Sequence, residues 1–143
     1  MAVVPFNKYY SYIDELASAG HNLKTAAFKV ALTNTAPTQA SDTVWNTTVA
    51  PAPAAANGYP SGGGTLTTAS AATAAGVFTL KINDYTFTAA GGSIGPFRYA
   101  ELYNSSASNK LVGYYDYGSS LTLLDTQTFK VDFDDTAGVL TVA

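Results

Sequence analysis

The stretch "GGSIGPFRYAELYNSSASNKLVGYYDYGSSLTL", residues 91–123, contains the pattern that decides the predicted fold. Alternating apolar and polar side chains are typical of β-strands, in which successive side chains point to opposite faces. In the second half of the stretch, Tyr115 and Tyr117 fall on one face and Tyr114 on the other. In the first half, one face carries Phe97, Tyr99, Glu101 and Tyr103. Because the polar sequence "NSSASN" separates the halves, we predict a β-hairpin in which most of these tyrosines are sheet residues.

The same period of two recurs along the rest of the chain. It is found at residues 28–33, 77–82, 85–87, 129–133 and 139–142, with polar or glycine-containing turns between them. Short strands at close spacing predict a mainly β protein, either an antiparallel β-sandwich or a jelly-roll-like barrel. A chain of 143 residues is long enough for one domain with its own core, and we predict a single domain over residues 1–143.

Residues 6–19 follow a helical period and predict one short N-terminal amphipathic helix. Pro5 suits the first turn of such a helix, and Gly20 suits the position after its end. Spacings of three and four place on one face the side chains of Phe6, Tyr9, Tyr10, Ile13, Leu16 and Ala17. A helix of this kind covers one end of a β-core or docks on a partner, and the sequence leaves both roles open.

A long segment between the first two predicted strands is poor in large apolar residues. Residues 36–64 include "PAPAAANGYPSGGG", which cannot build a core and predicts an extended, exposed loop or arm. Trp45, the one tryptophan, stands just before that sequence. We expect partner contacts on the helix, on this arm and on the exposed face of the hairpin. The candidate partner-binding residues are Phe6, Tyr9, Tyr10, Trp45, Tyr59 and Tyr114.

The charge content argues against several classes of partner. Only 12% of the residues are charged, against roughly 25% in an average globular protein, which suits a chain that works inside an assembly. The net charge is −3 and the seven basic residues are scattered, so we expect no nucleic-acid partner. No apolar stretch is long enough to span a bilayer, and we expect no membrane contact. The N-terminus lacks the pattern of a signal peptide, so we expect synthesis in the cytoplasm.

No catalytic or metal-binding pattern stands out. His21 is not accompanied by a nucleophile motif, and a histidine at a helix end is typical of a cation that suits the helix dipole. The spacing of a calcium loop is not met by Asp132, Asp134 and Asp135. No pairing of glycosidase type is singled out among Asp84, Glu101 and Asp116. We therefore predict no enzyme activity, no cofactor and no metal site.

The tyrosines leave one alternative open. Exposed tyrosine rings on a sheet can stack on sugars, and protein interfaces are also enriched in them. The hairpin face with Tyr114 and Asp116 is thus bare, touches a neighbouring protein or touches a sugar. A carbohydrate-binding β-sandwich module is the corresponding functional alternative.

Several sequence blocks resemble a family of small virion proteins of tailed bacteriophages. The blocks are F-N-K-Y…D-E-L-A near the start, L-K-T…F-K-V-A-L-T-N-T-A-P (residues 23–37), N-G-Y-x-x-G-G-G-T-L (57–66), G-P-F-R-Y-A-E-L-Y-N (95–104), L-V-G-Y-Y-D-Y-G-S-S (111–120) and the closing F-K-V-D-F…G-V-L-T-V. They run in order along nearly the whole chain. No active-site motif accompanies them, and the resemblance assigns no functional residues.

The resemblance implies a structural component of the virion. Within that class, the first expectation is a capsid decoration or cement protein that binds the head exterior and stabilises it. Its partners would be the major capsid protein, copies of itself, or both, and it would be oligomeric in the particle. The alternatives are a structural component of the tail or neck, and the carbohydrate-binding module introduced above.

Overall fold

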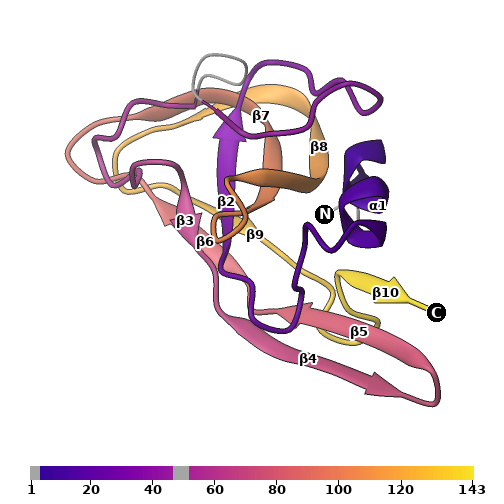
Figure 1. Cartoon of the computed structure of the whole chain (residues 1–143). Coiled ribbons are helices and arrows are strands. Elements are labelled where there is room, and N and C mark those ends of the chain that lie inside the picture. Colours follow the sequence, from indigo (N-terminus) through magenta and orange to yellow (C-terminus); the bar gives the residue numbers. More distant parts are fainter. Residues whose placement is uncertain (1–3, 47–51) are drawn as a thin grey trace.

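The computed structural model describes residues 4–46 and 52–143, and in this part of the chain ten strands accompany one helix (Figure 1). The elements are β1 (Asn7–Lys8), α1 (Tyr10–Ala17), β2 (Phe28–Thr33), β3 (Gly64–Thr65), β4 (Thr68–Ala74), β5 (Val77–Ile82), β6 (Tyr85–Thr88), β7 (Ile94–Asn104), β8 (Lys110–Leu123), β9 (Thr128–Val131) and β10 (Leu140–Val142). The chain is therefore mainly β with one short helix, as predicted.

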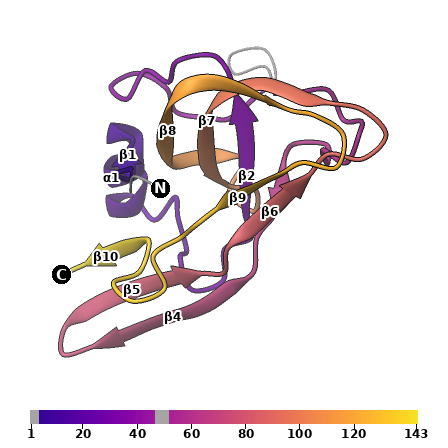
Figure 2. The same ribbon diagram turned by 180° about the vertical axis from the view of Figure 1, so that it is seen from behind.

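The strands form three antiparallel sheets. The largest has the order β1-β8-β7-β2-β3, a second has the order β10-β5-β4, and β6 pairs with β9. The predicted hairpin is β7 and β8, in which Glu101 is opposite Tyr114. The three-stranded sheet extends away from the large sheet, as seen from both sides (Figures 1 and 2). The arrangement is sandwich-like, in agreement with the predicted fold class.

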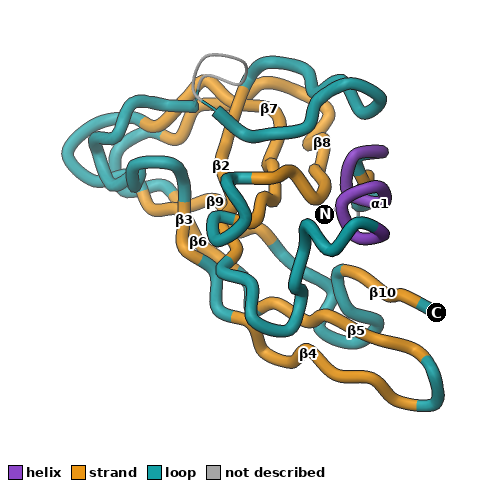
Figure 3. Tube along the Cα trace, viewed as in Figure 1, coloured by secondary structure: helices purple, strands orange, loops and turns teal. Residues whose placement is uncertain are grey.

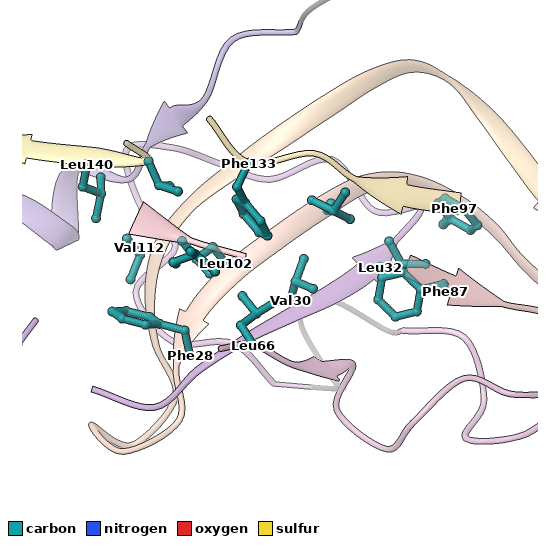
Figure 4. Packing of buried hydrophobic residues seen from close by; sticks show 14 of the residues in the cluster. Phe28, Val30, Leu32, Leu66, Phe87, Phe97, Leu102, Val112, Phe133 and Leu140 are labelled. Atoms are coloured by element: carbon teal, nitrogen blue, oxygen red, sulfur yellow. The ribbon is translucent and has the colours of Figure 1, made fainter. Parts of the chain in front are cut away.

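The main core lies between one face of the large sheet and the two smaller sheets. We call this the inner face of the large sheet, and β2 supplies Phe28, Val30 and Leu32 to it (Figure 4). The smaller sheets supply to the same cluster Leu80, Ile82, Phe87, Val131 and Leu140. All of these side chains are buried. Burial of this much apolar surface is the main force that holds the sheets together.

The predicted helix begins later than expected, and its buried face differs. Residues 7–8 are a strand that pairs with β8, and Tyr9 is the residue before the first turn, so the helix has eight residues rather than the predicted span 6–19. Tyr12 is 1% exposed, whereas Tyr10 and Ile13 are 62% and 55% exposed. Pairing with residues 7–8 gives hydrogen-bond partners to backbone groups on the edge of β8. If residues 7–8 were helical, those groups of β8 would lack these partners. This tertiary pairing overrides the helical period.

The two faces of β7 also differ from the simple alternation. Phe97 belongs to the main core, while Tyr103 packs on the opposite, outer face of the sheet. The pairing of β7 with β8 is irregular between Phe97, which is opposite Leu121, and Tyr99, which is opposite Asp116, and the regular alternation of sides is interrupted there. The prediction that Phe97 shares a face with Tyr103 was therefore wrong.

The described parts of residues 36–64 lie against the domain. Figure 3 shows this long loop between β2 and β3. Val44 forms a bridge with Lys110, and the Trp45 N–H donates to the Asn109 carbonyl at 2.8 Å. Residues 64–65 form a strand on the edge of the large sheet. Most described residues of this loop are exposed, as expected, but Trp45 and Tyr59 are buried and hold it against the domain. Residues 47–51 lie outside the described residues.

Candidate functional site

The outer face of the large sheet is covered by the arm. Trp45 stacks on Tyr103 of β7, with 4.8 Å between ring centroids and 4° between ring planes. The Tyr103 hydroxyl donates to the Gly62 carbonyl at 2.6 Å, so two points of the arm are held by one sheet residue. Burial raises the pKa of Tyr103 to about 12. Trp45 and Tyr103 are 6% and 2% exposed, which indicates that they fix the arm to the sheet.

Tyr59 anchors the second half of the arm inside the domain. Its ring stacks on Phe87 of β6 at 5.5 Å, and its hydroxyl accepts a hydrogen bond from the Leu32 N–H at 3.0 Å. The side chain is 3% exposed, and burial raises its pKa well above the ordinary tyrosine value. The sequence predicted Tyr59 as an exposed contact residue, because its proline- and glycine-rich surroundings gave no sign of a core position.

A buried acid lies on the same outer face. The Tyr9 hydroxyl donates to Oε1 of Glu101 at 2.9 Å, and the two residues are 0% and 2% exposed. Burial raises the pKa of Glu101 to about 7, the hydrogen bond from Tyr9 opposes that rise, and the nearby charge of Asp42 adds to it. A carboxyl group with a pKa near 7 is suited to proton transfer. Here the burial of both partners leaves their oxygens no exposed surface for a substrate, so the pair serves packing.

The other carboxylates considered for catalysis are engaged elsewhere. Asp116 forms a two-pronged ion pair with Arg98, at 2.7 and 2.9 Å, which lowers the pKa of Asp116. Asp84 accepts a hydrogen bond from Lys130 at 2.8 Å, and this contact lowers its pKa. Each acid has a different basic or phenolic partner, and no two of them share a contact that would make a catalytic pair.

The histidine and the C-terminal acids also have structural surroundings. His21 is 6% exposed and its Nδ1 lies 3.2 Å from the Asn104 amide nitrogen. Burial lowers the pKa of His21, which disfavours the cation expected at a helix end. Asp134 accepts backbone hydrogen bonds from Thr136 and Ala137, as turn residues do. Among the described residues, no three acidic or histidine side chains gather into a possible metal site.

The helix presents two large apolar side chains to solvent. Tyr10 and Ile13 are the exposed ones, on a helix held from both sides. The Tyr10 N–H donates to the Gln39 carbonyl at 3.1 Å, and the Ser11 hydroxyl donates to the Asp42 carbonyl at 3.0 Å. An ion pair between Glu15 and Lys110 joins the helix to β8. We call α1 together with residues 38–44 the helix–arm surface.

A cleft of about 520 Å³ lies between β7, β8 and β9. Three aromatic rings line it, from Tyr115, Tyr117 and Phe129. Tyr117 meets Phe129 edge-on at 5.7 Å and is 42% exposed. The lining also includes the charged residues Arg98 and Lys130, each of which is held in an ion pair. The volume and the mixture of rings with fixed polar groups fall in the range of small-molecule sites.

The six predicted contact residues thus divide by burial. Tyr9, Trp45 and Tyr59 are buried within the chain, so their side chains support the interior. Phe6 and Tyr114 are half-buried against β8 and Tyr9, while Tyr10 is exposed. Contacts of Phe6, Tyr114 and Tyr10 with a partner stay predictions. Of these three residues, Tyr10 has the most exposed side chain and is the best candidate for such a contact. Ile13 and Tyr117 are exposed but were not among the predicted contact residues. The helical period had placed Ile13 on the apolar face of the helix, and strand alternation had placed Tyr117 on the same hairpin face as Tyr115.

Comparisons with known proteins gave no relatives: no protein family, no curated protein and no solved structure matches this chain significantly. Within residues 4–46 and 52–143, no helix has the length and apolar character needed to cross a membrane.

Proposed function

We propose that this chain is a structural protein of a tailed bacteriophage that decorates the capsid exterior. The observation that carries the proposal is the exposure of Tyr10 and Ile13, at 62% and 55%, on a helix fixed by hydrogen bonds and an ion pair. Apolar side chains on a rigid element form contacts at a low cost in conformational entropy. The low charge of the chain supports the same role, since uncharged surface is easily removed from water in an assembly.

A binding role also agrees with what the polar groups do. The acid with the most displaced pKa, Glu101, is buried against Tyr9, and the other acids considered are held in ion pairs. A decoration protein needs none of them for chemistry. It stabilises a shell by binding the assembled state, and at a free concentration one hundred times Kd this amounts to about 2.7 kcal/mol per site.

The copy number in purified virions tests the location. A decoration protein is expected at about one copy per capsid subunit or per local symmetry contact, because each equivalent surface offers the same site. The band of this protein in purified particles, compared with that of the major capsid protein, gives the ratio. A handful of copies per particle would favour the tail or neck alternative and reject the capsid location.

A binding experiment tests the helix–arm surface. The double variant Tyr10→Ser, Ile13→Ser should rebind heads stripped of this protein at least about tenfold more weakly, since a fully buried large apolar side chain contributes about 1.5–3 kcal/mol. The matched control is Leu124→Ser, which removes an apolar side chain that is 61% exposed in another part of the molecule. Equal binding by the double variant and the wild type would exclude this surface.

The cleft favours a second candidate function, the binding of a carbohydrate. Tyr117 offers a partly exposed ring, and Arg98 and Lys130 are held beside it by ion pairs. Sugar recognition combines a ring face with fixed hydrogen-bonding groups of this kind. Retention on a column of host cell-wall polysaccharide should be lost with Tyr117→Ala and kept with Tyr10→Ala. No retention of the wild-type chain would reject this candidate.

A further inference from the structure

Among the strands that stand at the end of a sheet order in the described chain, β4 is the longest. In the three-stranded sheet the order is β10-β5-β4, so β4 pairs with β5 on one side and is an edge on the other. It has seven residues, whereas the edge strands β1 and β3 of the large sheet have two each. Edge strands present a row of backbone N–H and C=O groups that can pair with a further strand.

Most of this edge lacks the features that commonly protect edge strands. The sequence of β4 is TASAATA, without a charged residue or a proline, and five of its seven residues are exposed. Edge strands are commonly guarded by lysine, proline or a covering segment. Within residues 4–46 and 52–143, no other strand is paired with β4 and no backbone hydrogen bond from another segment reaches it. One register irregularity is present, near Thr68 at the base of the strand.

The turn after β4 leaves the edge accessible. Ala75 and Gly76 both have positive φ, 50° and 79°, which is the conformation of a tight hairpin turn that matches the twist of the flanking strands. Ala74 is opposite Val77 across this turn. The hairpin projects from the body of the molecule in both views (Figures 1 and 2). Its outer edge is therefore reachable by another molecule without rearrangement of the core.

We propose that β4 pairs antiparallel with β4 of a second copy of this chain, so that two three-stranded sheets join into one of six strands. Two antiparallel copies of one strand are related by a two-fold axis, and each then offers the other the same groups. Because β4 is uncharged, pairing does not bring like charges together, although each chain has a net charge of −3. Side chains in a sheet point to its two faces, so the small side chains of residues 69–74 do not obstruct this pairing.

This inference goes beyond the proposed function, because it concerns the free chain and names the surface for self-contact. One strand is a small interface, so the dimer is expected to be weak and to depend on concentration. It would be promoted where a particle holds copies close together. Failure of the pairing in solution would leave the virion proposal and its copy-number test unaffected.

Cysteine cross-linking tests the pairing directly, since the natural chain has no cysteine. Single cysteines at each position from 70 to 74 should form disulfide dimers on mild oxidation, fastest at the position nearest the two-fold axis. Opposed residues in antiparallel strands have Cα atoms about 4.5–5.5 Å apart, within disulfide range. The fastest position should react at least about tenfold faster than the exposed control Thr88→Cys in β6, because pairing raises the local thiol concentration. Equal rates at all positions would overturn the proposal.

Sedimentation equilibrium of the chain without cysteine gives an independent result. The wild type should show a concentration-dependent rise from 14.8 kDa towards twice that mass. Thr73→Lys should abolish the rise, because each copy would bring a charged side chain into the paired edge, and Thr88→Lys should not. Far-UV circular dichroism establishes that both variants are folded. A wild type that stays monomeric at millimolar concentration, or an equal effect of both lysines, would reject β4 pairing.

Discussion

Glu101 shows how a single buried group can control the pH dependence of folding. Its carboxyl group is 2% exposed and has one hydrogen-bond donor, the Tyr9 hydroxyl. Burial raises its pKa to about 7, so the folded state favours the protonated form. The stability from this group is fully present below its ordinary pKa of 4.5 and is lost as pH rises through about 7.

Glu101→Gln should remove this dependence while keeping the hydrogen bond from Tyr9. The variant should match the wild type near pH 4.5 and be more stable at pH 8 by up to about 3 kcal/mol. Burial lowers the pKa of His21, whose contribution has the opposite sign and is gained as pH rises through its ordinary value. Both proteins contain His21, so its contribution cancels in the difference between their free energies of unfolding. Urea unfolding at several pH values provides the measurement, and parallel curves would contradict the buried-acid explanation.

Gly63 illustrates a close backbone approach that only glycine permits. Its φ is +89°, and an added Cβ would lie 2.1 Å from the Val30 carbonyl oxygen. Gly63→Ala should therefore destabilise the fold by more than about 3 kcal/mol, because backbone must move. Gly91 is the control: its φ is +81° but nothing lies within 4 Å of an added Cβ. Gly91→Ala should lower the free energy of unfolding only by the cost of a positive φ in alanine, about 1 kcal/mol. Equal destabilisation by the two variants in thermal unfolding would refute the steric explanation.

At the scale of elements, the arm is held by aromatic side chains that the sequence made look exposed. Trp45 stacks on Tyr103, and Tyr59 packs on Phe87. Long loops in compact domains keep a fixed course only when their own side chains supply such anchors. The arm thereby covers much of the outer face of the large sheet. The exposed functional candidates of the molecule are then the helix, the cleft and β4.

Trp45→Ala should loosen the arm more than it affects the main core. The loss of a buried tryptophan typically costs about 3–5 kcal/mol, and here it also releases the stacking on Tyr103. Limited proteolysis should then cleave within residues 36–60 faster than in the wild type. Val44→Ala, at a neighbouring position that is 39% exposed, serves as the control. If both variants were cleaved at the wild-type rate, Trp45 would not be the anchor.

At the scale of the whole molecule, the core links all three sheets. Phe28 from the large sheet, Leu80 from the three-stranded sheet and Phe87 from the two-stranded sheet belong to one buried cluster. A shared core predicts cooperative unfolding of the chain as one unit. It also makes the position of each sheet depend on the others.

The cooperativity has a simple measurement, because Trp45 is the one tryptophan. Its fluorescence reports on the outer face of the large sheet, and far-UV circular dichroism reports on the strands as a whole. The two denaturation curves should coincide. Two separated midpoints would show that the outer face unfolds independently, and would contradict the predicted single domain.

The sequence by itself determined the β class, the hairpin of β7 and β8 and the presence of one helix. These follow from local alternation and turn residues, which act over a few neighbouring positions. Only the tertiary structure decided that residues 7–8 form a strand, that Phe97 points inward and that Tyr59 is buried. Each depends on a partner far along the chain, such as β8 for residues 7–8. Local period cannot reveal such a partner, because backbone pairing and burial are satisfied across the whole fold.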